Sequence, residues 1–316
     1  MEGDAALKMM TSSPLPLLAR APGFAMKDRI HPVAAMVSSC QIEPHFAEVQ
    51  AKSVLNESGI TDWTVNCYSG CEHGCLYCYA RFASRFSHPH ELWGSYVDVK
   101  VNAPQVLERE VKRKKVGKVF VSSVCDGWQP VEEKYGLTRR CLEILLRHDF
   151  PVTILTKSSL AGRDLDLLIG KNDVDFGVTI TTLDESLSKL LEPKSSPPAA
   201  RLALIEEAKG KGIRTYAFLG PLMPYLSDSE KSLGLLLNAV KEVGADYFYV
   251  DRLNPRYGVW SSLKVLLHER FPHLVEDYKK ILFSKSVRER YSERLVARLG
   301  KLAEQLRLSD KMSLIF

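Results

Sequence analysis

The feature that most constrains the fold is a regular alternation of short β-branched apolar runs with amphipathic stretches of helical period. The runs Lys118–Ser122, Val152–Leu155 and Val174–Ile180 predict strands. Between and beyond them, Thr138–His148 and Ser229–Val243 predict helices. Strands that alternate with helices build βαβ units, so the chain is predicted to be of the α/β class with a parallel sheet.

Further segments extend the same rhythm. The predicted strands are Trp63–Asn66, Arg214–Leu219 and Tyr247–Val250, and the predicted helices are Ala103–Lys115, Arg163–Ile169, Leu183–Leu191 and 199–210. Six such units without a Gly-rich dinucleotide motif after the first strand favour a partial (β/α)6 TIM-type barrel over a doubly wound sheet. We expect an irregular leader over 1–45, the barrel over 46–255, and a helical C-terminal extension over 256–316 packed on the barrel.

Charge and hydropathy indicate in which compartment the protein is expected and which partners it can bind. The chain has 316 residues, a net charge of +5, and no run approaching the roughly 20 apolar residues that a membrane span needs. The LPLLA segment near the start is too short for a secretory signal. We therefore expect a cytoplasmic protein without membrane association, whose mild basicity permits a polyanionic partner without requiring one.

Cysteine spacing carries the strongest chemical signal. Four of the seven cysteines fall within twelve residues: Cys67, Cys71, Cys75 and Cys78. In a chain without a signal peptide this clustering indicates metal ligation in a reducing compartment. The last three have the spacing C-x3-C-x2-C, and three thiolates can hold three corners of a 4Fe–4S cluster while one iron keeps open coordination sites.

Two other interpretations of the same loop stay open at this point. Cys67 creates a second register, C-x3-C-x3-C, and is otherwise a small core residue. Alternatively, all four thiolates bind zinc in a non-catalytic knuckle that contacts nucleic acid. His73, between two of the cysteines, is expected on the loop surface.

The loop also carries a family resemblance. The string GCEHGCLYCYAR at 70–81 resembles the signature of the radical SAM superfamily, and more narrowly its spore photoproduct lyase-like branch. The likeness extends to DGWQPVE at 126–132, LTKS at 155–158 and GVTITT at 177–182. It favours as cluster ligands Cys71, Cys75 and Cys78.

The resemblance implies a specific chemistry. A 4Fe–4S cluster would bind S-adenosylmethionine and cleave it reductively to a 5′-deoxyadenosyl radical, which abstracts hydrogen from a substrate. An electron donor such as flavodoxin or ferredoxin is implied as a partner. The protein would supply binding, orientation and exclusion of water, because the cofactor carries the difficult step.

Polar residues at the strand ends are the candidate contacts to S-adenosylmethionine. Lys157 follows the run VTILT and Asp126 follows KVFVSSVC, and the matching residues of the family hold the cofactor. Without that role, Lys157 pairs with a nearby acid and Asp126 is a turn residue. Further candidates are Ser123 or its neighbour Ser122, and Thr179 and Thr181, which face the same side of their strand.

The candidate catalytic residues are Tyr77, Tyr79 and Cys125. In spore photoproduct lyases a tyrosine near the active site helps to return the hydrogen, and the donor cysteine lies just before the strand-end Asp. Cys125 has that place here, although Ser123 fits it about as well. Trp128 stands where the family has tyrosine, so lyase activity on thymine photodimers is not expected.

The segment after the sixth strand suggests the substrate class. Arg252, Asn254 and Arg256 follow that strand and suit a phosphate-bearing ligand. Together with the resemblance and the positive charge, they make a nucleic acid or nucleotide the expected substrate.

Overall fold

The structure, a computed structural model, describes residues 43–316. Its main sheet contains eight strands in the order β11-β10-β9-β8-β7-β6-β3-β2. Neighbouring strands from β3 to β11 are parallel, and β2 pairs antiparallel with β3 at one edge. The strands are β2 (Leu55–Glu57), β3 (Trp63–Val65), β6 (Val119–Val121), β7 (Val152–Thr156), β8 (Val174–Ile180), β9 (Arg214–Leu222), β10 (Tyr247–Arg252) and β11 (Met312–Leu314).

The six strands from β3 to β10 that run in parallel confirm the predicted partial barrel. All seven residues of β8 are buried, as are four of the five in β7. A parallel strand covered on both faces reads as a continuous apolar run, which is why these segments were recognisable.

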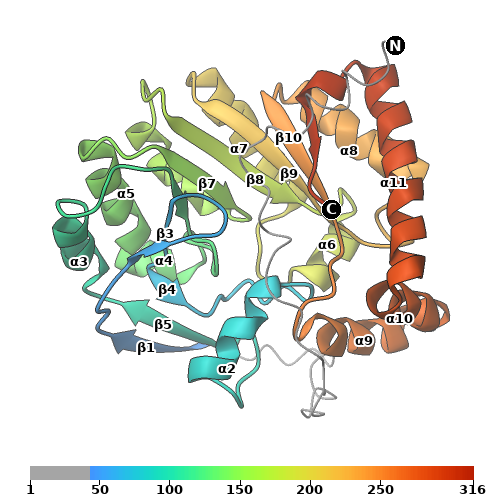
Figure 1. The fold of residues 1–316 in the computed structure, drawn as a ribbon, viewed down its shortest axis with the longest axis horizontal. Coiled ribbons are helices and arrows are strands. Elements are labelled where there is room, and N and C mark those ends of the chain that lie inside the picture. Colours follow the sequence, from blue (N-terminus) through green and yellow to red (C-terminus); the bar gives the residue numbers. More distant parts are fainter. Residues whose placement is uncertain (1–42) are drawn as a thin grey trace.

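Helices pack around the outside of the curved sheet (Figure 1). They are α3 (Ala103–Glu110), α5 (Leu137–Arg147), α7 (Pro198–Gly210) and α8 (Glu230–Glu242). Two shorter helices, α4 (Val131–Tyr135) and α6 (Glu185–Leu191), lie instead beside the cysteine loop, which they contact through hydrogen bonds. Local signals set their starts: Pro198 opens α7, and Asp184 caps α6 by accepting a hydrogen bond from the Leu187 amide at 3.0 Å. The segment expected as a helix over Arg163–Ile169 is instead a 3-10 helix, η2 (Ser159–Leu167), which begins where the Ser158 side chain caps the Leu160 amide.

The C-terminal region lies against the side of the sheet that ends with β10 (Figure 1). It contains α9 (Val259–Arg270), η3 (Pro272–Leu274), α10 (Val275–Phe283), α11 (Lys285–Leu306) and η4 (Ser309–Lys311). Pro272 interrupts the helices, as expected for a residue that cannot continue one. The chain then returns as β11, a strand that the sequence did not predict, and pairs with β10.

A second, three-stranded sheet was also not predicted. It has the order β1-β5-β4 and consists of β1 (His45–Val49), β5 (Tyr96–Lys100) and β4 (Tyr68–Ser69). The short helices η1 (Tyr79–Ala83) and α2 (Ser84–Ser87) lie between β4 and β5 in the chain. This sheet flanks the cysteine loop. Of the predicted leader over 1–45, residues 1–42 lie outside the part of the chain that the structure describes. Its last residue, His45, is the first residue of β1.

Among residues 43–316, none of the helices is both long enough and apolar enough to cross a bilayer.

Candidate functional site

One cavity lies at the carboxyl ends of the parallel strands, where barrel enzymes carry their chemistry. Its walls come from the cysteine loop and from five strand ends, which contribute Ser122 and Ser123 after β6, Lys157 after β7, Thr179 of β8, Gly220 of β9 and Asp251 of β10. The topology thus brings together residues that lie far apart in the chain, such as Cys71 and Asp251.

The cysteine loop forms one wall of the cavity. Cys71, Cys75 and Cys78 all line it, and the first two are 6% and 5% exposed. Gly70 and Gly74 adopt positive φ angles of 87° and 62°, which lets the loop turn tightly. The three thiols are free, as ligation requires.

The three thiols have the donor chemistry of a cluster site. In a cubane, three thiolates bind three different irons and leave the fourth iron open. Cys71, Cys75 and Cys78 are free thiols on one wall of the cavity, so the donor set fits a 4Fe–4S cluster.

Cys67 lies apart from this trio. It is buried in the main core with its Sγ 3.5 Å from Cys141 Sγ, and it does not line the cavity. The contact with Cys141, together with burial, raises the pKa of its thiol well above the ordinary value. A four-thiolate knuckle would lack its fourth ligand in this arrangement.

The segment 126–132 holds the cysteine loop in shape. The Glu72 amide donates to Gln129 Oε1 at 2.8 Å, and Gln129 Nε2 donates to the Gly70 carbonyl at 3.4 Å. In return, the Val131 amide donates to Glu72 Oε1 at 2.6 Å. Gln129 is fully buried. This segment carries the motif DGWQPVE, whose physical role is thus to hold the backbone of the cysteine loop.

Asp126 connects this segment to the end of β7. Its carboxylate accepts from the Thr156 hydroxyl and the Lys157 amide, both at 2.7 Å. His73 Nδ1 lies 3.4 Å from the same carboxylate. The expectation that His73 lies on the surface was wrong: it is 2% exposed, and burial lowers its pKa despite the opposing charge of Asp126. The fold packs the loop against Asp126, which covers the imidazole.

Lys157 is the cation of the cavity wall. Its Nζ lies 5.9 Å from the centre of the Tyr77 ring. Burial acts to lower the pKa of Lys157, but its electrostatic interactions with Cys75, Glu192 and Asp126 outweigh burial, so the net pKa is raised. Lys157 therefore stays protonated and able to bind a carboxylate.

Glu192 and Arg201 form a buried ion pair that the sequence analysis did not identify. Arg201 Nη2 donates to the Glu192 carboxylate, and both side chains are 1% exposed. Tyr77 also donates to Glu192, and Thr181 Oγ1 lies 3.0 Å from Glu192 Oε1. An arginine inside an otherwise ordinary helix gives no local signal of such a partner, since the contact depends on the turn between α6 and α7, which brings together two side chains nine positions apart.

The predicted cofactor contacts differ in how they face the cavity. Thr179 lines it, whereas Thr181 does not, and its hydroxyl donates to the Gly220 carbonyl at 3.0 Å. Ser122 has a φ of +66°, unusual for a residue with a side chain, and its buried Oγ has no hydrogen-bond partner in the described structure. Ser123 also lines the cavity and accepts from Thr64 Oγ1 at 2.9 Å.

The predicted catalytic residues all line the cavity, but they differ in exposure and in their hydrogen bonds to the rest of the protein. The Tyr77 hydroxyl is buried and forms hydrogen bonds with Glu192 and Thr181, so its hydrogen-bonding capacity is used within the protein. Tyr79 is 36% exposed and donates to the Ser123 carbonyl. Cys125 Sγ makes a weak 3.8 Å contact with Asn66 Oδ1, and burial raises its pKa to about 12, so it is a neutral thiol.

Polar residues at the end of β10 and just after it also line the cavity. Asn254 Nδ2 donates to both carboxylate oxygens of Asp251, at 3.0 and 3.1 Å. Burial nevertheless raises the Asp251 pKa to about 7. Arg252 and Arg256 line the cavity as well.

Comparison with known proteins identifies the family. The model of the Radical SAM superfamily matches residues 65–236, more than half of the chain. An uncharacterized protein of Methanocaldococcus jannaschii is 31% identical over 256 residues, which cover 80% of this chain and 93% of that protein. An uncharacterized protein of Mycobacterium tuberculosis is 30% identical over 273 residues, which cover 81% of this chain and 80% of that protein.

Solved structures share the fold at low identity. A spore photoproduct lyase complexed with dinucleoside spore photoproduct matches with a TM-score of 0.61 and 13% identity, covering 86% of this chain and 82% of that one. A variant of that lyase with bound S-adenosylmethionine matches with a TM-score of 0.62 and 14% identity, covering 85% of this chain and 81% of that one. The family match and the relatives show that this chain belongs to the radical SAM superfamily, whose enzymes use a 4Fe–4S cluster and S-adenosylmethionine.

Proposed function

We propose that the protein holds a 4Fe–4S cluster on Cys71, Cys75 and Cys78, cleaves S-adenosylmethionine reductively, and removes hydrogen from a nucleic acid or nucleotide. The observation that carries the proposal is the convergence of three free thiols, two of them buried, with Lys157 and Asp126 on one cavity. When bound, the cluster and S-adenosylmethionine supply a 5′-deoxyadenosyl radical as the hydrogen-abstracting group.

The residues of the chain bind and orient the cofactor. Lys157 keeps its positive charge in the cavity and is suited to the methionine carboxylate. Asp126 fixes the Lys157 backbone through its amide. Ser122, Ser123 and Thr179 offer hydroxyls from two strand ends. Trp93 and Phe218 line the same cavity and reduce the access of water.

Cleavage of the cofactor is tested by anaerobic reconstitution with iron and sulfide, followed by addition of dithionite and S-adenosylmethionine. We expect 5′-deoxyadenosine and methionine in equal amounts. Replacement of Cys78 by Ala should abolish both the cluster and the product. Cys141→Ala is the matched control, because that buried cysteine lies outside the cavity, and it should retain both. Stoichiometric zinc without sulfide would instead support the knuckle interpretation.

Lys157→Ala separates cofactor binding from cluster binding. Iron content should be unchanged, while the affinity for S-adenosylmethionine should fall at least tenfold, which is about 1.4 kcal/mol. The exposed Lys115→Ala serves as the control for loss of a positive charge. Unchanged affinity of Lys157→Ala would refute the role given to this side chain.

The substrate class is supported by the wall after β10. Arg252 and Arg256 bring positive charge to the cavity, and Asn254 presents an amide beside them. Cys125 and Tyr79 line the cavity too and are suited to hydrogen return, with Ser123 the alternative to Cys125. Deuterated DNA and RNA oligonucleotides and mononucleotides should transfer deuterium into 5′-deoxyadenosine. Turnover that leaves all of these unlabelled would exclude this substrate class.

The proposed reaction requires an electron donor and a reducing compartment. A low-potential electron must reach the cluster, so we propose a flavodoxin or ferredoxin as the donor. Thiolate-ligated iron requires a reducing compartment, which favours the cytoplasm.

A further inference from the structure

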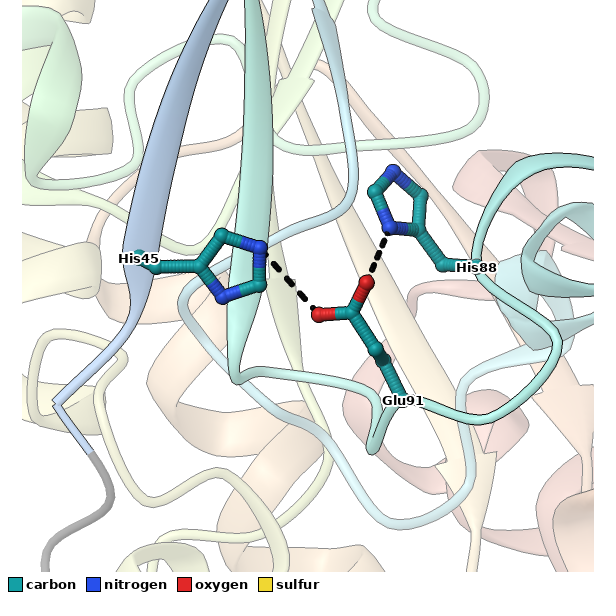
Figure 2. A group of neighbouring side chains, drawn as sticks. All are labelled: His45, His88 and Glu91. Atoms are coloured by element: carbon teal, nitrogen blue, oxygen red, sulfur yellow. Dashed lines mark hydrogen bonds and ion pairs between the residues drawn. The ribbon is translucent and has the colours of Figure 1, made fainter.

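Two histidines and a glutamate form a cluster outside the cavity. Figure 2 shows His45 at the start of β1 and His88 after α2 directed toward the carboxylate of Glu91. His45 Nε2 lies 3.2 Å from Glu91 Oε2, and His88 Nδ1 lies 2.6 Å from Glu91 Oε1. One ligand atom from each residue lies within 4.8 Å of the others, and among residues 43–316 this is the single group of three His, Cys, Asp or Glu with that spacing.

His88 is fixed in an orientation suited to metal ligation. Its Nε2 lies 3.0 Å from Asp98 Oδ2, and its ring stacks on Tyr96 with centroids 3.8 Å apart. A carboxylate behind a ligating imidazole sets the tautomer and the ring direction in metal sites. Asp98 thereby leaves Nδ1 of His88 as the atom that faces Glu91.

We propose that His45, His88 and Glu91 bind one divalent transition-metal ion of the zinc type, with water as the fourth ligand. Imidazole and carboxylate donors suit such ions. Bonds of about 2.0–2.2 Å put the ligand atoms of a tetrahedral site roughly 3.4 Å apart. The 3.2 Å separation between His45 Nε2 and Glu91 Oε2 fits this value. The three ligand atoms, one from each residue, already lie within 4.8 Å of one another, so closure around an ion requires shifts of about 1.4 Å or less. The 58% exposed His45 side chain gives the ion access.

The ion would brace the segment that packs on the cysteine loop. The His45 amide donates to the Ser95 carbonyl at 3.0 Å. Next to Ser95, Gly94 lies so close to Gly74 that an added Cβ would be 2.9 Å from the Gly74 Cα. A metal bridge from β1 to Glu91 therefore restrains the backbone that supports the cysteine loop.

The test uses tag-free protein with its cysteine cluster reconstituted, so that the cavity thiols are occupied. Calorimetric titration with Zn²⁺ should give one site, and Co²⁺ should give the visible absorption of a four-coordinate ion. His88→Gln and Glu91→Gln should weaken Zn²⁺ binding at least tenfold, and Asp98→Asn should weaken it less. His148→Gln is the matched control, since His148 pairs with the single carboxylate of Glu108, and its affinity should equal that of the unaltered protein.

Retained absorbance of the reconstituted cluster shows that each variant is folded. If the folded His88→Gln and Glu91→Gln variants bind Zn²⁺ as tightly as the unaltered protein, or if the unaltered protein binds none, the proposal is wrong. Because the readout is stoichiometric metal binding and not turnover, failure of this site leaves the proposed radical chemistry untouched.

Discussion

Gly70 has no room for a side chain. Its φ is +87°, and an added Cβ would lie 2.3 Å from the Tyr96 carbonyl oxygen. Gly70→Ala must therefore displace either the cysteine loop or β5. Gly136 has a similar φ of +59° but no atom within 4 Å of its added Cβ, so Gly136→Ala should cost only the conformational strain of about 1–2 kcal/mol.

We expect Gly70→Ala to lower the melting temperature more than Gly136→Ala and to reduce the iron bound per chain. Calorimetry and iron analysis of the two variants measure this. Equal loss of stability in both, with full iron content, would show that the loop accommodates a side chain at position 70.

Asp251 links stability to pH. Burial raises its pKa from 3.8 to about 7, so protonation favours the folded state. That contribution is complete below pH 3.8 and is lost as the pH rises through about 7. Asp251→Asn imitates the protonated form, so its stability relative to the unaltered protein should grow by roughly 2 kcal/mol between about pH 5.5 and 8.

Urea unfolding of the two proteins at both pH values gives this difference. A difference that does not change with pH would mean that the Asp251 carboxyl titrates alike in the folded and unfolded chains.

Gln129 joins two elements that are far apart in the chain. It bonds the Glu72 amide and the Gly70 carbonyl from the segment that follows β6. Gln129→Ala leaves these buried backbone groups without partners, at a cost of about 1–3 kcal/mol each. The cluster should then be lost faster to a chelator, as followed by its visible absorbance. Gln105→Ala, on the exposed side of α3, should lose iron at the original rate.

Elements that are buried on both faces were predictable, and short paired elements were not. The runs VTILT and VDFGVTI identify β7 and β8 because both faces are apolar. In contrast, β1 reads HFAEV with exposed and half-buried residues, and β4 has two residues. These strands form because β5 lies between them, and a window of local sequence does not contain that partner.

The candidate site follows the same division. The spacing of Cys71, Cys75 and Cys78 and the strand-end position of Lys157 are local, so the sequence identifies them. Two other features arise from contacts between segments far apart in the chain. These are the burial of His73 and the hydrogen bond between Thr181 and the Gly220 carbonyl. The pairing of Glu192 with Arg201 spans only nine positions, but it depends on the turn between α6 and α7, whose geometry the residue pattern does not give.

At the scale of the whole molecule, the C-terminal strand closes one edge of the sheet. β11 pairs along β10, and Met312 is 8% exposed. Deletion of residues 312–316 should expose the β10 edge and lose the burial of Met312, worth about 1.5–3 kcal/mol. We expect a lower melting temperature and concentration-dependent association, measurable by light scattering. A monomeric deletion variant of unchanged melting temperature would contradict this function of β11.

The hydrogen bonds between Gln129 and the cysteine loop also bear on biogenesis. Glu72 and its partner Gln129 are 57 positions apart, and the carboxylate of Asp126 reaches Thr156 of β7. During synthesis the ribosome releases the cysteines long before these supports exist. Metal loading of the supported loop must then follow translation of Thr156, so maturation factors would meet a chain in which the strands up to β7 have already been made.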